Sequence, residues 1–179
     1  EVEMGSTTFT QKSEVQTDFS LTFFFSETCF LVAIDSCISN LEDLSGKRVG
    51  CARGTTNLRA VEQLASDVKF SPKDIVVTET HPQGMLALKS GKIEAYSTDR
   101  SLLEGLRMKD QEPDKWMTVA FAIAYEPYAY IMREGNSDFR DFVNNTIIWS
   151  IHNGKFQELY EKWMGPKGLV PIPMSEAYK

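Results

Sequence analysis

The fold is decided by the stretch Arg48-Val49-Gly50-Cys51-Ala52, which runs directly into Arg53-Gly54-Thr55-Thr56-Asn57. The first five residues are typical of a short buried strand, and the next five predict a loop, because glycine and threonine favour turns. After this loop, apolar residues recur three or four positions apart, as one face of a helix requires. These residues are Leu58, Val61, Leu64, Ala65 and Val68. The stretch therefore predicts a strand, a loop and a helix in succession.

The same alternation continues toward the C-terminus. Strands are predicted at 75–77 and 93–96, and helices are predicted to begin at His81-Pro82 and at Ser101. Strands that alternate with helices of about ten residues indicate right-handed crossovers and a mostly parallel sheet. The fold class expected from the residues alone is therefore α/β.

The segments that flank this region are predicted to be structured as well. Further strands are expected at 18–34, 119–124 and 128–132. Two helices follow, with apolar faces over 139–151 and 156–163, and the aromatic stripe of the second helix is expected to lie in the core. Three prolines predict that residues 166–179 run extended over the surface.

Composition limits the classes of function. The chain has 179 residues, of which 42% are hydrophobic and 25% charged, and its formal net charge is -6. This length allows one core or two small lobes, and the acidic balance argues against nucleic acid as a partner. No apolar run approaches the roughly 18 residues of a membrane span. No metal-ligand spacing, phosphate loop or nucleophile-base motif is seen, so no metal, cofactor or catalytic residue is predicted.

Three cysteines, Cys29, Cys37 and Cys51, complete the inventory. Cys29 and Cys51 lie in apolar strand-like runs, where a small buried hydrophobic role is the simplest interpretation. A disulfide between Cys29 and Cys37 is an alternative in an oxidising compartment.

Two glycine-hydroxyl segments are candidates for anion binding. Gly54-Thr55-Thr56 precedes a predicted helix, where backbone N–H groups and hydroxyls favour a carboxylate. An ordinary threonine N-cap explains the same residues. Gly5-Ser6-Thr7-Thr8 has similar chemistry, and it either binds a carboxylate or makes a turn.

Two titratable residues follow predicted strands. Asp99 lies at the end of an apolar strand, where parallel sheets place ligand-binding groups. It either accepts a hydrogen bond from an ammonium group or caps the following helix. His81, just before Pro82, either caps its own helix or presents an imidazole to a ligand. Donors for anions together with a carboxylate for a cation indicate a binder of zwitterions.

Several phrases together resemble the bacterial extracellular solute-binding proteins of family 3, the polar amino-acid-binding proteins that serve ABC transporters. In chain order they are Gly5-Ser6-Thr7-Thr8, Asp18-Phe19-Ser20, residues 41–50 leading to Gly54-Thr55-Thr56, residues 88–95 leading to Asp99, and residues 130–135, 153–156 and 162–165. The resemblance runs from about residue 4 to residue 165. The order and spacing of the phrases together make it specific.

The resemblance implies a periplasmic-binding-protein-like (type II) clamshell of two α/β lobes with ligand held between them. The first lobe would contain residues 1–33 and 127–179, and the second would contain residues 34–126. Family members carry further strands and a helix before the point where this chain begins, so the first lobe is expected to be incomplete. An exposed sheet edge would follow, and with it either self-association or membership of a longer protein.

The resemblance also assigns roles to individual residues. Ser6, Thr7 and Thr8 would contact the ligand from the first lobe, Thr55 and Thr56 would donate to its carboxylate, and Asp99 would accept from its ammonium group. His81 stands where glutamate/aspartate-binding members place a histidine against the side-chain carboxylate of the ligand. This agreement implies an acidic amino acid as the ligand.

The sequence departs from the family at one ligand-binding position. Family members have an arginine seven or eight residues after the first-lobe glycine, where this chain has Lys12 and Ser13. Lysine supplies charge without the planar fork of a guanidinium, and Arg53 is a candidate for the replacement charge.

The expected role is that of a periplasmic or lipid-anchored extracytoplasmic component that delivers a small-molecule amino acid to the membrane permease of an ABC transporter. Two alternatives remain open. A cyclic-acid dehydratase on the same scaffold would use His81 as its acid-base residue. A sensor domain excised from a receptor would share the fold without the transporter.

Overall fold

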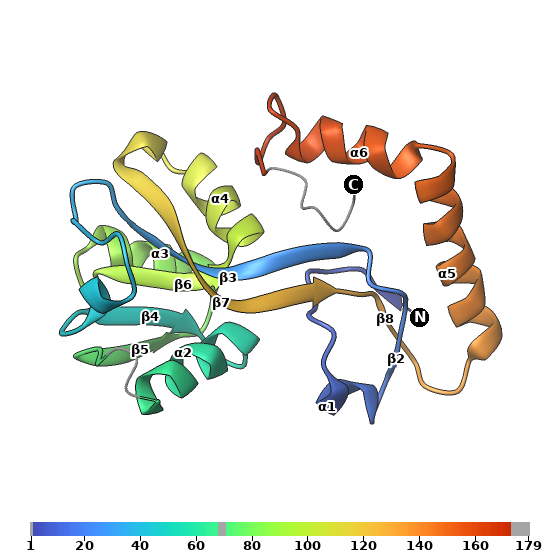
Figure 1. Cartoon of the computed structure of the whole chain (residues 1–179), viewed down its shortest axis with the longest axis horizontal. Coiled ribbons are helices and arrows are strands. Elements are labelled where there is room, and N and C mark those ends of the chain that lie inside the picture. Colours follow the sequence, from blue (N-terminus) through green and yellow to red (C-terminus); the bar gives the residue numbers. More distant parts are fainter. Residues whose placement is uncertain (1, 68–70, 173–179) are drawn as a thin grey trace. The chain divides into compact units, whose positions relative to one another are not determined.

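The computed structural model describes residues 2–67 and 71–172, and these form two compact units (Figure 1). Unit 1 contains Glu1–Ser26 and Glu126–Lys179, and unit 2 contains Glu27–Tyr125. The boundaries expected from the sequence were 33/34 and 126/127. Each unit is described by itself below.

Unit 2 is built on a five-stranded sheet with the order β5-β4-β6-β3-β7. The strands are β3 (Phe24–Ala33), β4 (Arg48–Ala52), β5 (Asp74–Thr78), β6 (Ala95–Asp99) and β7 (Trp116–Tyr128). Strand β4 is parallel to both β5 and β6, whereas β3 is antiparallel to β6. The parallel sheet expected from the sequence is therefore its central part, within a mixed α/β sheet.

Helices cover both faces of this sheet. They are α2 (Thr56–Ser66), α3 (His81–Lys89) and α4 (Arg100–Met108), and two short 3₁₀ turns lie at Glu42–Leu44 and Pro113–Lys115. Successive side chains of a strand point to opposite faces, and β3 follows this rule. Phe30 packs in one core cluster with Val61 of α2, whereas Leu31 packs in another with Met85 of α3 and Leu103 of α4.

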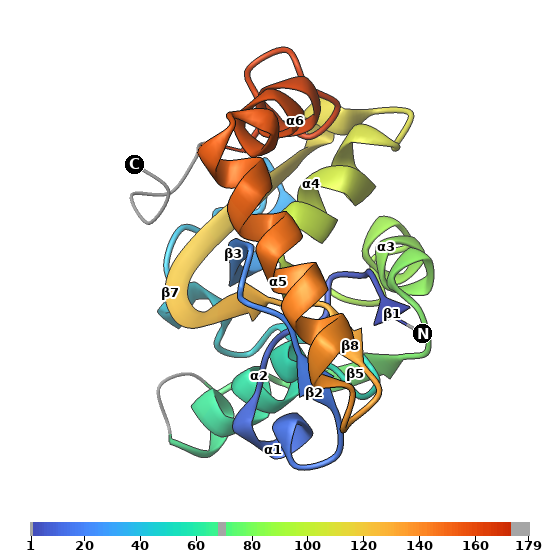
Figure 2. The same ribbon diagram turned by 90° about the vertical axis from the view of Figure 1, so that its right-hand side faces the viewer.

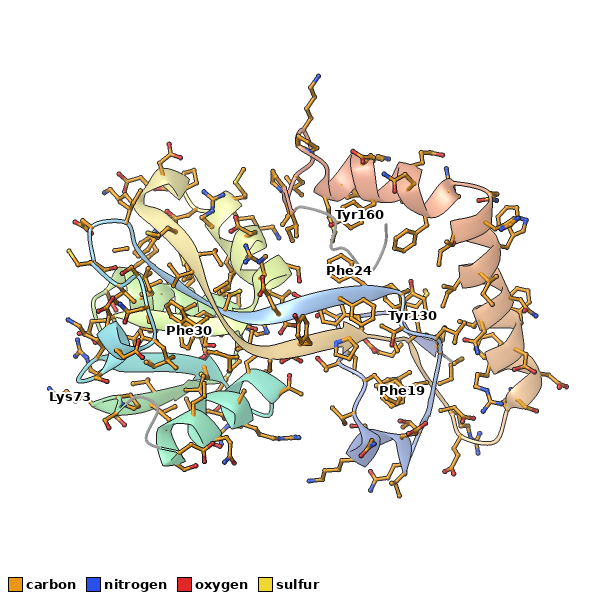
Figure 3. The ribbon with its side chains drawn as sticks, in the orientation of Figure 1. Phe19, Phe24, Phe30, Lys73, Tyr130 and Tyr160 are labelled. Atoms are coloured by element: carbon orange, nitrogen blue, oxygen red, sulfur yellow. The ribbon has the colours of Figure 1, made fainter. Side chains whose placement is uncertain are left out.

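Unit 1 has a small antiparallel sheet with the order β1-β8-β2. The strands are β1 (Val2–Glu3), β2 (Asp18–Phe19) and β8 (Ile131–Met132), and the helices are α1 (Gln11–Glu14), α5 (Ser137–His152) and α6 (Lys155–Met164). Phe24, Tyr128 and Tyr160 form its core cluster, with the ring of Phe24 stacked on both tyrosines at centroid distances of 5.5 and 6.2 Å. Figure 3 shows Phe24 and Tyr160 of this cluster. Helices α5 and α6 meet at Gly154, whose φ of 79° is left-handed (Figure 2).

The apolar stripes of α5 and α6 are less buried than the sequence predicted. Tyr160 lies in the core, but Leu159 and Trp163 are 43% and 51% exposed. On α5, Phe142 and Trp149 are 66% and 64% exposed. Helical spacing identifies an apolar face, but it does not say which element covers that face. In the described part of unit 1, the small sheet leaves much of the apolar face of α5 and α6 exposed to solvent.

Three local predictions also need correction. Residues 18–34 form two strands, β2 and β3, and Pro82 is the second rather than the first residue of α3. Residues 166–170 form turns and bends instead of an extended segment, while residues 173–179 and Val68 lie outside the described residues. Among the helices described, none has the length and apolarity that a bilayer crossing requires.

Candidate functional site

Three predicted site segments of unit 2 lie at one edge of the sheet. In the parallel strands, Ala52 of β4 pairs with Thr78 of β5, and Cys51 pairs with Ser97 of β6. The carboxyl ends of these strands therefore coincide. Ligand-binding groups of parallel sheets gather at such edges. The residues that follow the strands here are Arg53, Thr55 and Thr56 after β4, His81 after β5, and Asp99 as the last residue of β6.

Thr55 caps helix α2, as the simpler of its two interpretations predicted. Its hydroxyl oxygen accepts a hydrogen bond from the backbone N–H of Leu58 at 3.1 Å and donates to the carbonyl of Ala52 at 2.9 Å. Gly54, with φ of 76°, makes the left-handed turn that brings the chain into the helix. Since a hydroxyl has one proton, an anion at this end of α2 would be held by the helix N-terminus rather than by the Thr55 hydroxyl.

Asp99 is held in a buried polar network instead of capping α4. It is the N-cap residue of that helix, but its side chain makes no capping hydrogen bond. One carboxylate oxygen accepts a hydrogen bond from the Asn57 amide at 2.8 Å, and the same amide nitrogen lies 3.0 Å from the Thr28 hydroxyl. The amide oxygen of Asn57 accepts from Thr98 at 3.3 Å. These four side chains are each at most 4% exposed. The buried hydrogen bonds therefore fix the orientation of the Asp99 carboxylate.

Sequence reasoning missed Asn57 and Thr28. Asn57 is the second residue of α2, and a polar side chain at a helix start is ordinary, so nothing in the sequence marks it as buried. Thr28 opposes Asp99 across the antiparallel β3–β6 pair. Beside this pair, Arg100 forms an ion pair with Glu27 at 2.5 Å, which places charge of both signs next to the network.

His81 is the first residue of α3 and is half-buried. The helix is capped by Thr80, whose hydroxyl accepts from the N–H of Gln83, so capping by His81 is not what the structure has. Its Nδ1 atom lies 3.0 Å from the hydroxyl of Tyr96 on β6. Burial lowers the pKa of His81 below its ordinary value, so the imidazole is neutral at neutral pH.

The two candidate cations differ in their surroundings. Arg53 is largely exposed and forms an ion pair with Glu79, with Nε 2.9 Å from Oε1. An exposed pair of this kind contributes little stability, so the guanidinium can exchange Glu79 for another carboxylate at little cost. Lys12 lies exposed on the short helix α1 of unit 1.

The hydroxyl segment of unit 1 lies beside two carboxylates that the sequence did not indicate. Thr7 donates to Glu3 at 2.8 Å, and Thr8 donates to Glu126 at 2.6 Å. Glu126 is only 1% exposed, and Thr8 forms an isolated β-bridge with Tyr128. Because both hydroxyl protons are used, Thr7 and Thr8 present oxygen lone pairs, which suit an ammonium group better than a carboxylate. Ser6 is exposed.

The cysteines are free thiols, so the Cys29–Cys37 disulfide is not formed. Cys29 and Cys51 are fully buried, as expected for small core side chains, and burial raises the pKa of each to about 12. Cys37 is exposed. Within residues 2–67 and 71–172, no cluster of three or more His, Cys, Asp or Glu side chains has the geometry to hold a metal ion.

Comparison with known proteins gives a consistent picture. A family model described as bacterial extracellular solute-binding proteins, family 3, matches residues 1–166. The L-glutamate/L-aspartate-binding protein of Pseudomonas aeruginosa is 32% identical over 100% of this chain and 61% of its own length. The glutamate/aspartate import solute-binding protein of Salmonella typhimurium is 30% identical over 96% of the chain and 55% of its own length.

Solved structures show the same fold. An ancestral arginine-binding protein bound to glutamine superposes with a TM-score of 0.80 at 27% identity, covering 92% of this chain and 71% of that one. The fold is thus that of the amino-acid-binding periplasmic proteins. The chain spans 55–61% of the length of the two curated relatives above.

Proposed function

We propose that this chain, which belongs to the bacterial extracellular solute-binding proteins of family 3, binds an amino acid with an acidic side chain. The observation that carries the proposal is the convergence of three different groups at the carboxyl edge of the unit 2 sheet. They are the N-terminus of α2, the neutral imidazole of His81 and the fixed carboxylate of Asp99.

Each group matches one end of the proposed ligand. The positive end of the α2 dipole favours the α-carboxylate. The buried carboxylate of Asp99 favours the ammonium group, because a desolvated acceptor binds a cation strongly. A neutral imidazole with an N–H group donates to a side-chain carboxylate. Arg53, whose ion pair with Glu79 is exposed, supplies positive charge beside the helix terminus. Two relatives at 30–32% identity are named for glutamate and aspartate, which agrees with this reading.

The candidates in unit 1 are proposed as contacts of a different kind. Thr7 and Thr8 already donate to Glu3 and Glu126, so their oxygens would accept from the ammonium group of the ligand. Ser6 and Lys12, both exposed, would supply a hydroxyl and a positive charge.

We also propose the wider role that the family carries. The protein would be the extracytoplasmic binding component of an ABC transporter and would pass its amino acid to a membrane permease. This rests on the family match over residues 1–166 and on relatives whose names describe binding or import. We propose no enzymatic turnover.

Isothermal titration calorimetry of the chain with L-glutamate, L-aspartate, L-glutamine and L-arginine tests the proposal. We expect saturable binding of the two acidic amino acids, with weaker binding of the other two. Asp99→Asn removes the charge but keeps an acceptor for Asn57, and it should weaken binding at least tenfold while the protein stays folded. Asp114→Asn, at an exposed position, serves as the matched control and should bind like the wild type.

Three results would overturn the proposal. They are no binding of any amino acid, a preference for arginine, and an Asp99→Asn variant with unchanged affinity. Chromatography of the incubated ligand separates binding from chemistry. Recovery of glutamate intact is expected, whereas a dehydrated product from a cyclic acid would favour the dehydratase alternative.

A further inference from the structure

Tyr96 is a fully buried tyrosine whose ring is fixed by two glycines. It is the second residue of β6, and its exposed fraction is 0%. A Cβ atom at Gly84 of α3 would lie 2.0 Å from Cε2 of the ring, and one at Gly50 of β4 would lie 3.0 Å from Cδ2. Distances this short mean that the ring occupies the space that side chains at these positions would fill. The Tyr96 ring is therefore packed closely against α3 at Gly84 and against β4 at Gly50, and this packing fixes the direction of its hydroxyl.

This direction carries the hydroxyl to His81. The oxygen of Tyr96 lies 3.0 Å from Nδ1, and the two rings meet edge to face at an interplanar angle of 76°. The geometry is that of a direct hydrogen bond, so one of the two groups donates and the other accepts. A neutral imidazole has one N–H and one bare nitrogen, and the partner of Nδ1 decides which nitrogen carries the proton.

The chemistry of the two groups decides the direction of this bond. A phenol is a stronger acid than the N–H of neutral imidazole, and an imidazole nitrogen is a stronger base than a phenol oxygen. The proton therefore stays on oxygen and is donated to Nδ1. Burial raises the pKa of Tyr96 to about 12, so the phenol keeps its proton at all relevant pH values. The position of His81 at a helix N-terminus further disfavours the imidazolium.

We propose that Tyr96 is a positioning residue that locks His81 in the tautomer with its proton on Nε2. His81 then presents an N–H donor at the carboxyl edge of the sheet. A donor at this place favours a carboxylate and opposes an ammonium or guanidinium group on the ligand side chain. The lock thus selects acidic over basic amino acids. This role in ligand choice rests on the proposed function, whereas the tautomer itself does not.

Other hydrogen-bonding groups near the phenol are consistent with this arrangement. The Thr78 hydroxyl also interacts with Tyr96. This contact works to lower the pKa of the phenol, as a hydrogen bond donated to its oxygen does. The Thr78 hydroxyl lies 3.3 and 3.4 Å from the carbonyls of Thr80 and Cys51, which is long for a hydroxyl donor. With the Thr78 proton on the phenol oxygen, the proton of the phenol is left for Nδ1. The charged side chains next to this pair in the sequence are themselves paired: Glu79 with Arg53, and Glu94 with Arg48. The imidazole is therefore set by the phenol rather than by a neighbouring charge.

Nitrogen-15 NMR of the imidazole rings tests the lock without any ligand. The chain contains two histidines, and the exposed His152 at the end of α5 is an internal reference. At pH 8 we expect His81 of the wild type to show a bare Nδ1 and a protonated Nε2. Tyr96→Phe keeps the ring and removes only the hydroxyl, so the two nitrogen shifts of His81 should move toward each other as the tautomers mix. Those of His152 should not change.

Tyr160→Phe is the matched control. It removes another buried tyrosine hydroxyl, which donates to the carbonyl of Ile172 in unit 1, and it should leave the His81 shifts unchanged. A wild-type spectrum with the proton on Nδ1, or a His81 spectrum that Tyr96→Phe does not alter, would overturn the lock.

Calorimetry then tests the role in ligand choice. Tyr96→Phe should weaken glutamate binding about five- to tenfold and reduce the preference for glutamate over arginine. In a His81→Gln background the same change should have no further effect, because the residue through which Tyr96 acts is gone. An equal loss of glutamate affinity in the wild-type and His81→Gln proteins would show that Tyr96 acts through packing and not through His81. If the spectra show the lock but the wild type binds no amino acid, the proposed function fails and the role in ligand choice fails with it.

Discussion

Replacing Asn57 by alanine tests how much of unit 2 depends on the buried network around Asp99. The substitution removes an amide that donates to Asp99 at 2.8 Å, lies 3.0 Å from the Thr28 hydroxyl, and accepts from Thr98 at 3.3 Å. Its partners are buried, with exposed fractions of 0% for Thr28, 1% for Thr98 and 4% for Asp99. Water therefore cannot replace the lost hydrogen bonds without entering the core.

The expected loss follows from the kinds of bond involved. A hydrogen bond to a carboxylate contributes about 1.5–3 kcal/mol, and a neutral one contributes about 1 kcal/mol. The long bond from Thr98 adds little, and the higher helix propensity of alanine returns about 0.5 kcal/mol. The free energy of unfolding of unit 2 should therefore fall by about 2–4 kcal/mol. For a unit of this size the urea dependence is about 1 kcal/mol per molar, so the midpoint should fall by about 2–4 M.

Urea unfolding followed by circular dichroism measures this change. Asn145→Ala, at an exposed position on α5, is the matched control and should lose less than about 0.5 kcal/mol. Glutamate affinity of the Asn57→Ala protein should also drop, since the Asp99 carboxylate is no longer held in place. A midpoint shift below about 0.5 M with an unchanged slope would refute the idea that the network supports the site.

Three further predictions concern other parts of the chain. The pKa of His81 is lower in the folded protein than its ordinary value of 6.5, so its contribution to stability is present above pH 6.5 and is lost as pH falls through the folded-state pKa. The melting temperature of the wild type should therefore fall with pH below 6.5. His81→Gln should flatten this dependence. Ellman's reagent at pH 8 should label Cys37 rapidly in the folded protein. Cys29 and Cys51, with pKa values of about 12, should react only after denaturation. Fast labelling of two thiols in the folded protein would contradict the burial of Cys29 and Cys51. The exposed apolar face of α5 should make the chain self-associate. Trp149→Glu should shift the sedimentation coefficient toward that of the monomer. A wild-type protein that stays monomeric at high concentration would contradict this prediction.

Features that depend on local chain geometry were predictable from the sequence. The strand expected at 48–52 is confirmed as β4, and the helix expected after the glycine-threonine loop is confirmed as α2. The position of Asp99 at a strand end is confirmed too, because a parallel sheet with alternating helices places its strand ends at a common edge. Each of these follows from spacing over a few residues.

Features that join distant parts of the chain were not predictable. The contact between Thr8 and Glu126 spans 118 positions, and the one between Asn57 and Asp99 spans 42. Both depend on which strands become neighbours, and a single sequence does not specify that. The exposure of Trp163 is a similar case, because helical spacing identifies an apolar face without naming its partner.

The allocation of hydroxyl protons changes how acidic ligands can be recognised. From the sequence, Thr7, Thr8 and Thr55 all resembled donors for a carboxylate, and in the structure each donates its proton to another group of the protein. A hydroxyl whose proton is committed can only accept, so these side chains cannot distinguish glutamate from arginine by donation. Donation to the ligand side chain then depends strongly on His81. A single imidazole whose tautomer is reversed would offer a bare nitrogen and would favour a cation instead. The proton on the His81 ring would thus contribute to specificity for an acidic ligand, beside the charges of Arg53 and Lys12. The Tyr96 hydroxyl, 3.0 Å from Nδ1, therefore has consequences beyond its own packing.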